Sequence, residues 1–68
     1  MLLKSLSHRE KEVVRLMAEG QTITEIAREI NISCETVKTH RENIYRKLGV
    51  TKKSNCLKKA RELGFFEE

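Results

Sequence analysis

The 68-residue sequence contains no proline and no tryptophan, only three glycines, and 4% aromatic residues. So few turn-forming and aromatic residues argue against a β-sandwich or barrel and favour a small helical domain. No apolar stretch approaches the roughly 18 residues of a membrane-spanning helix, and nothing resembles a signal peptide. We therefore predict a single all-α domain, residues 1–68, located in the cytoplasm.

Residues that hold metals or carry out catalysis are also scarce. Cys34 and Cys56 lack the CxxC spacing of a zinc or redox site, and the two histidines complete no ligand set. The sequence contains no recognisable nucleophile–base pair and no glycine-rich phosphate loop. We expect two reduced cysteines, no metal, no cofactor and no enzymatic activity.

What the sequence does have is charge: 35% of its residues are charged, and the net charge is +4. Residues 1–33 contain five basic and five acidic side chains, whereas residues 34–68 contain nine basic and five acidic ones. The whole excess therefore lies in the second half. A one-sided basic excess is expected of a surface that binds a polyanion.

Local signals predict four helices, over about residues 8–19, 23–30, 34–48 and 52–63. The expected N-caps are small polar residues, Ser7, Thr22, Ser33 and Thr51. Two of these caps precede a glutamate by three residues, the capping-box pattern. Each helix is followed by a residue suited to the left-handed conformation: Gly20, Asn31, Gly49 and Gly64.

Apolar residues recur at helical spacing and define a candidate core. Its members are Val13, Leu16, Met17, Ile23, Ile26, Ala27, Ile30, Ile32, Val37, Ile44, Leu48, Cys56, Leu57, Ala60 and Leu63. Phe65 and Phe66 are expected to fold back onto this core, and Glu67 and Glu68 to fray.

The predicted helix over residues 34–48 has two chemically different faces. At about 100° per residue, Val37, Ile44 and Leu48 fall within about 40° of one another. The opposite arc is polar: Glu35, Lys38, Thr39, Glu42, Asn43 and Arg46. Only residues 31–33 separate this helix from the preceding one, which favours a helix-turn-helix, although a plain helical bundle also satisfies the periodicity. In a helix-turn-helix, such a polar face can read base edges in DNA.

Several motifs at fixed spacings then resemble one family, the LuxR-type (GerE-type) bacterial transcription regulators. The first half of the resemblance is carried by Leu6-Ser7-His8-Arg9-Glu10, Glu12-Val13, Leu16, Ala18 and Gly20. The second half is carried by Glu25-Ile26-Ala27, Ile32-Ser33, Thr36-Val37-Lys38, His40, Ile44, Lys47-Leu48 and Val50. The fourth region of sigma factors shares part of this pattern, but it typically continues with Ser-Arg where this chain has Thr39-His40.

The resemblance implies a four-helix domain that binds promoter DNA, with residues 34–48 as the recognition helix. It further implies a homodimer on DNA, with helix 52–63 as a contact, and RNA polymerase as another partner. Members often carry a receiver or ligand-binding domain, which we do not find in a sequence whose Met1 lies close to the domain edge. The target sequence and the controlling signal are not encoded in recognisable form.

The candidate DNA-binding residues have different expected roles. Lys38 and Thr39 are expected to contact bases. Glu35 and Glu42 either accept from cytosine or pair with Lys38 and Arg46. Phosphate or backbone contacts are expected from Thr24, Ser33, Thr36, Asn43, Arg46, Lys47 and Lys53. His40 and Tyr45 are expected to be packing residues. Thr24, with Ile23, stands where the family usually has polar or basic residues, which predicts weaker binding.

The alternative function is a protein-interaction module, an anti-activator that keeps the fold and pairs with another regulator. The glutamates of helix 34–48 and the apolar Ile23 are the features that support it. DNA binding is favoured because it also explains the basic second half of the chain.

Overall fold

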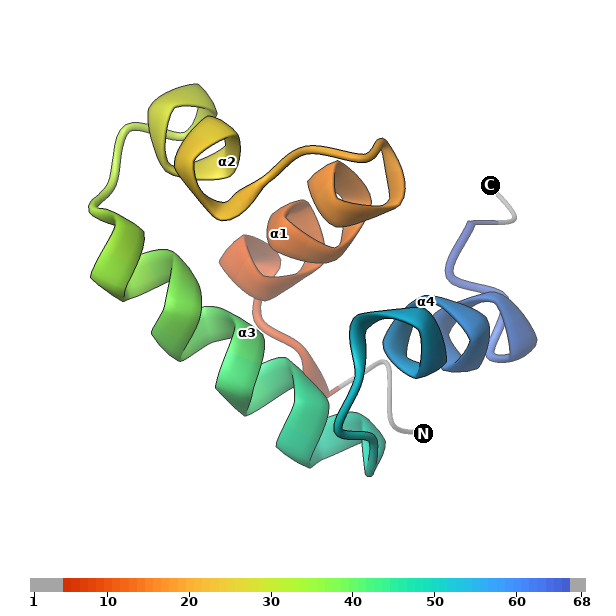
Figure 1. Ribbon diagram of the computed structural model, residues 1–68. Coiled ribbons are helices and arrows are strands. Elements are labelled where there is room, and N and C mark those ends of the chain that lie inside the picture. Colours follow the sequence, from red (N-terminus) through yellow and green to blue (C-terminus); the bar gives the residue numbers. More distant parts are fainter. Residues whose placement is uncertain (1–4, 67–68) are drawn as a thin grey trace.

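The computed structural model describes residues 5–66 and is helical throughout, without strands in that range. Its helices are α1 (His8–Ala18), α2 (Ile23–Glu29), α3 (Cys34–Leu48) and α4 (Lys53–Glu62). The longest helix, α3, packs against all three others, and α2 and α4 lie toward its two ends (Figure 1). None of the described helices combines the length and apolar character needed to cross a membrane. The predicted all-α fold is confirmed.

The first three helices begin where their capping residues stand. Ser7 N–H donates to Glu10 Oε1 at 2.9 Å, and Glu10 N–H donates to Ser7 Oγ at 3.1 Å. Thr22 and Glu25 form the same reciprocal box, at 2.8 and 3.2 Å. Each box satisfies two N–H groups that have no partner within the helix. The predicted capping boxes are therefore confirmed.

The short turn between α2 and α3 confirms the helix-turn-helix. Asn31 adopts the left-handed conformation with φ of 58°, which asparagine tolerates better than most residues. Ile32 N–H then donates back to Ala27 C=O at 3.0 Å, and the Ile32 side chain is half-buried against the core. Ser33 Oγ accepts from Thr36 N–H at 3.1 Å and so begins α3. The left-handed Gly49, with φ of 71°, ends it.

The start of α4 differs from the prediction. Lys52, not Thr51, is the N-cap; its side chain makes no capping hydrogen bond, and the first turn contains no acidic residue. Tertiary packing sets the position of this helix, because Cys56 and Ala60 are both fully buried and fix which face turns inward. The first helical bond, from Cys56 N–H to Lys52 C=O at 2.9 Å, then places the cap at Lys52.

This uncapped helix end makes a testable prediction. Replacing Lys52 by serine is expected to stabilise the domain by about 1 kcal/mol, because serine can accept from a free N–H and removes a cation from the positive end of the helix. Thermal unfolding would then shift upward by about 4–8 °C for a domain of this size. The control Lys58→Ser removes the same charge from an exposed position inside α4. An equal shift for both variants would contradict the capping explanation.

The core lies between the four helices. Its fully buried members include Val13, Ile26, Val37, Ile44 and Cys56, all at 0–1% exposure. Several predicted members lie at its edge and are half-buried: Leu16, Ile23, Ile30, Ile32, Leu57 and Leu63. Val14 and Leu6 are buried but were absent from the predicted set.

The C-terminal aromatic pair is only partly as predicted. Phe65 folds back as expected and is 5% exposed, with the Arg15 guanidinium 5.3 Å from its ring centre. Phe66 is 36% exposed and stands edge-on to Phe65, so its predicted burial is wrong. The expected fraying of Glu67 and Glu68 concerns residues outside the described range.

Candidate nucleic-acid interface

The two faces of α3 differ in exposure as sharply as in chemistry. Val37, Ile44 and Leu48 are buried, at 0–2% exposure, and hold the helix against its neighbours. The opposite arc carries polar side chains that are exposed, apart from the half-buried Asn43: Glu35, Lys38, Thr39, Glu42, Asn43 and Arg46. Packing one face therefore leaves a complete polar face available to an external partner.

Lys38 and Glu35 are neighbours on this face. The Lys38 Nζ lies 4.0 Å from Glu35 Oε2, and the two side chains are 49% and 88% exposed. An exposed pair at this distance is worth at most about 1 kcal/mol. The ammonium can therefore exchange this carboxylate for a DNA acceptor at little cost.

Further along the helix, Arg46 has a different partner from the one expected. Its guanidinium donates to Asn43 Oδ1 at 3.0 Å rather than pairing with Glu42. The predicted Glu42–Arg46 pair is thus not formed, because the guanidinium is directed to the Asn43 amide oxygen three residues earlier in α3. The Glu42 carboxylate stays exposed on the polar face.

The start of α3 gathers small polar groups. Ser33 Oγ lies 2.8 Å from Thr36 Oγ1, and both side chains are exposed. Thr24, on α2, has its Oγ1 4.0 Å from the thiol of Cys34, the first residue of α3. The free N–H groups and dipole of the first turn favour an anion in this place.

Lys47 points into the domain. Its Nζ lies 2.8 Å from Glu10 Oε1 and donates to Ser5 C=O, also at 2.8 Å. The Glu10 side chain is only 6% exposed, whereas that of Lys47 is 33% exposed. Burial alone would raise the pKa of Glu10, but the hydrogen bonds from Lys47 and Ser7, the Lys47 charge and nearby His40 together outweigh it. The pKa of Glu10 therefore lies below its usual value.

Sequence reasoning missed this ion pair. Glu10 was recognised only as a capping residue, and Lys47 only as a basic position of the family. The two residues are 37 positions apart, so no helical periodicity connects them. The only available signal was the position of Glu10, one turn before the buried Val13 and Val14 on the same side of α1. A carboxylate on the buried side of a helix needs a partner.

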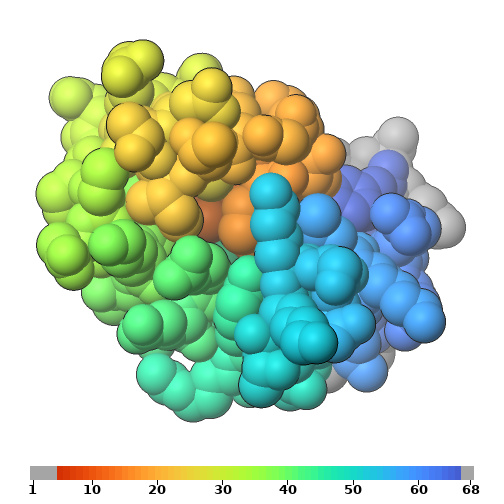
Figure 2. All heavy atoms as spheres, viewed as in Figure 1, coloured from red at the N-terminus to blue at the C-terminus, as the bar shows by residue number. Residues whose placement is uncertain are grey.

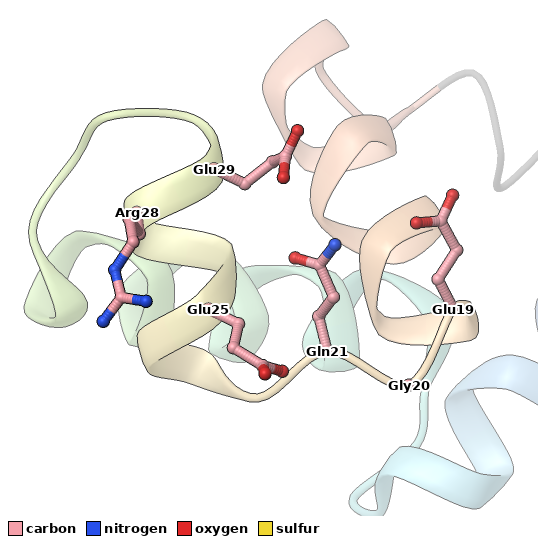
Figure 3. A pocket seen from close by; sticks show the side chains of 6 residues that line it. All are labelled: Glu19, Gly20, Gln21, Glu25, Arg28 and Glu29. Atoms are coloured by element: carbon pink, nitrogen blue, oxygen red, sulfur yellow. The ribbon is translucent and has the colours of Figure 1, made fainter.

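One hollow of the described surface is acidic. It has a volume of about 650 Å³ and lies between the end of α1 and α2 (Figure 3). Its charged lining consists of Glu19, Glu25, Glu29 and Arg28. Gln21 also lines it, and its Oε1 is buried with no partner among the described residues. The excess of carboxylates excludes this hollow as a DNA contact, and no group of three metal-binding side chains occurs within residues 5–66.

A basic helix-turn-helix whose second helix exposes a polar face is the architecture of a DNA-binding domain. Comparison with known proteins agrees: residues 4–60 match the family described as bacterial regulatory proteins, luxR family (GerE). The chain belongs to this family and is a DNA-binding domain of a transcription regulator.

Individual relatives support the assignment. YhjB of Escherichia coli K12, named as an HTH-type transcriptional regulator, is 46% identical over 54 residues, which are 79% of this chain and 27% of YhjB. The HTH-type transcriptional regulator MalT of Yersinia pestis is 36% identical over 58 residues, which are 85% of this chain and 6% of MalT. The crystal structure of response regulator ChrA, from a heme-sensing two-component system, superposes with a TM-score of 0.87 at 36% identity, covering 90% of this chain and 30% of ChrA.

YhjB and MalT are both named as HTH-type transcriptional regulators, and ChrA as a response regulator. The chain spans 27% of YhjB and 40% of the E. coli response regulatory protein YgeK, so it corresponds to a minor part of each.

Proposed function

We propose that α3 enters the major groove of promoter DNA and that Lys38 and Thr39 contact base edges there. The observation that carries this proposal is the exposed polar face of α3 opposite a fully buried apolar face. Lysine can donate to guanine O6 or N7, and the threonine methyl group can contact that of thymine. Glu35 and Glu42 contribute sequence choice by accepting from cytosine N4, and Glu42 is free of its expected partner on α3.

Backbone phosphates are held on both sides of this helix. Thr24, Ser33 and Thr36 contact one strand at the start of α3, where N–H groups and hydroxyls converge. Asn43, Arg46 and Lys53 provide the remaining backbone contacts. Lys47 is the exception, since a phosphate contact would require its ammonium to leave the buried Glu10 carboxylate. We therefore assign it to the stability of the domain.

In the complete regulator, two copies bind two half-sites, with α4 as their contact. The outward side of α4 carries exposed polar residues only: Ser54, Asn55, Lys58, Arg61 and Glu62. Such a surface supports a dimer that forms on DNA rather than a strong apolar one. RNA polymerase is a further partner at the promoter. The domain performs no catalysis and needs no cofactor. It acts in the cytoplasm, on DNA of the nucleoid. No observation favours the anti-activator alternative.

The contribution of Lys38 can be measured directly. Lys38→Ala is expected to weaken binding to a duplex selected from a random library by about tenfold, because a good base contact is worth about 1–3 kcal/mol. Fluorescence anisotropy with a labelled duplex gives the affinity, and circular dichroism verifies the fold. The matched control is Lys11→Ala, which removes an exposed positive charge from α1. Equal affinities of the two variants would contradict the role of Lys38.

A further inference from the structure

A second hollow has no acidic side chain among its lining residues, in contrast to the first. It is a crevice of about 220 Å³ that opens where residues 17–26, the middle of α3 and the start of α4 meet (Figure 2). Its floor is apolar, made by Met17, Ile23 and Ile26. Its charged lining is Arg41 and Lys53, with Tyr45 beside them, and none of its described lining residues is acidic.

The polar lining of this crevice comprises Arg41, Tyr45 and Lys53, which are donors, together with Gln21 and Thr22. Arg41 and Tyr45 are half-buried and Lys53 is exposed at the rim. Among residues 5–66, none of the three forms a hydrogen bond or an ion pair. A half-buried guanidinium with no acceptor is costly unless a ligand or water supplies one. Burial raises the pKa of Tyr45 above its ordinary value, with Cys56 adding to the rise and Arg41 opposing it, so the phenol stays a donor at neutral pH.

Lys53 occupies a position that local energetics disfavour. It is the first residue of α4, where the helix dipole repels a cation, and it follows another lysine at an N-cap with no side-chain hydrogen bond. Two cations at the positive end of a helix, with no acidic residue in the first turn, weaken the helix. Such a local conflict is expected where a residue serves a ligand instead of the fold.

The crevice is continuous with the proposed DNA-reading face. Lys38, Arg41 and Tyr45 stand at i, i+3 and i+7 along α3 and so form one row on its flank. The row leads from the exposed Lys38 to the crevice beside the start of α4. A DNA strand that borders the groove containing α3 would therefore pass over the crevice.

We infer that this crevice is an anion site that holds one phosphate of the DNA backbone, bound by Arg41, Tyr45 and Lys53. Arginine offers paired N–H donors that match phosphate oxygens, lysine adds a point charge, and the phenol adds a neutral donor. The bound phosphate carries no sequence information; it fixes how deeply and in which register α3 lies in the groove. The inference rests on the proposed entry of α3 into DNA.

Binding of a short random-sequence duplex, measured against KCl concentration, tests the site. Arg41→Gln and Lys53→Gln are each expected to weaken binding about fivefold to tenfold at about 0.1 M salt. Because the two cations share one phosphate, the double variant should lower the log–log salt slope by about 1, and each single variant should lower it by less. Tyr45→Phe should have a smaller effect and leave the slope unchanged. The double variant should lose less than the product of the single losses, because both cations hold the same phosphate. Arg41→Lys should retain the slope.

Lys11→Gln is the matched control on α1 and should bind like the wild type. Because Arg41 is half-buried, circular dichroism must verify that its variants remain folded. Lys53 is exposed, so Lys53→Gln still tests the site if the Arg41 variants unfold. If the double glutamine variant keeps the wild-type affinity and slope while Lys38→Ala loses affinity for its selected duplex, the crevice assignment is wrong and the role of α3 stands. If wild-type binding itself shows no salt slope, both proposals fall.

A separate measurement distinguishes free phosphate from DNA. Tyr45 is the only tyrosine, and there is no tryptophan, so intrinsic fluorescence reports on this crevice alone. Sodium phosphate should change the emission no more than sodium chloride at equal ionic strength. A saturable, phosphate-specific change that Arg41→Gln abolishes, together with unaltered duplex binding by that variant, would assign the crevice to free phosphate and overturn the DNA assignment.

Discussion

Raising the salt concentration from about 50 to 200 mM is expected to weaken duplex binding roughly 250-fold to 1000-fold. If about five phosphates are neutralised, counterion release gives a log–log slope of roughly −4 to −5, and a fourfold change in salt then produces a loss of this size. The cations available for these contacts include Lys38, Arg41, Arg46 and Lys53, and the start of α3 adds N–H donors. Fluorescence anisotropy with a labelled duplex measures the slope.

The fold must be shown to survive both conditions, which circular dichroism at each salt concentration establishes. Lys38→Ala provides the internal comparison, since a phosphate contact at this residue would lower the slope by about 1, whereas a base contact through a lysine would mainly change sequence preference. A slope near zero for the wild type would contradict DNA binding through a basic face.

The second large effect concerns the ion pair that crosses the domain. Lys47→Met is expected to lower the free energy of unfolding by about 2–3 kcal/mol, because it leaves the buried Glu10 carboxylate without its cation. Loss of one partner of a fully buried pair costs about 3–5 kcal/mol, and the exposure of one third of the Lys47 side chain reduces that value. A domain of this size has only about 3–5 kcal/mol in total. Urea unfolding measures the change.

The double variant Glu10→Gln/Lys47→Met is the matched control. It removes both charges, so it should regain part of the stability lost in the single variant, although it cannot restore all hydrogen bonds of the pair. If it were no more stable than Lys47→Met, the loss would come from packing of the lysine side chain and not from the unpaired carboxylate. Lys58→Met, at an exposed position on α4, should change stability little.

The pH dependence follows from the same pair. The pKa of Glu10 is lower in the folded domain than its ordinary value of 4.5, so folding favours the carboxylate. Its stabilising contribution is complete above the unfolded pKa and is lost as the pH falls through the folded value. Wild-type stability should therefore decline more steeply below about pH 4.5 than that of the double variant. Parallel curves would indicate that other carboxylates govern acid unfolding.

Local chemistry in the sequence determined the helices and the turn between α2 and α3. The capping boxes of Ser7 and Thr22 and the left-handed Asn31 depend on residues at most three positions apart, so they can be recognised without a structure. The inward face of α3 follows from the 3.6-residue period for the same reason. The family motifs lie on these elements, so fold and DNA-binding class could both be predicted from the sequence.

Tertiary structure alone decided which charged side chains have partners within the domain. Lys47 and Lys53 both look like surface cations in the sequence. In the fold, Lys47 pairs with Glu10 of α1, whereas Lys53 lines a crevice that contains no acidic residue. Packing of Cys56 and Ala60 moved the cap of α4 to Lys52. Arg41 and Tyr45 of α3 line one crevice with Lys53 of α4, and this arrangement depends on the packing of α4 against α3. Electrostatic partners depend on distances across the fold, and the order of residues along the chain does not contain those distances.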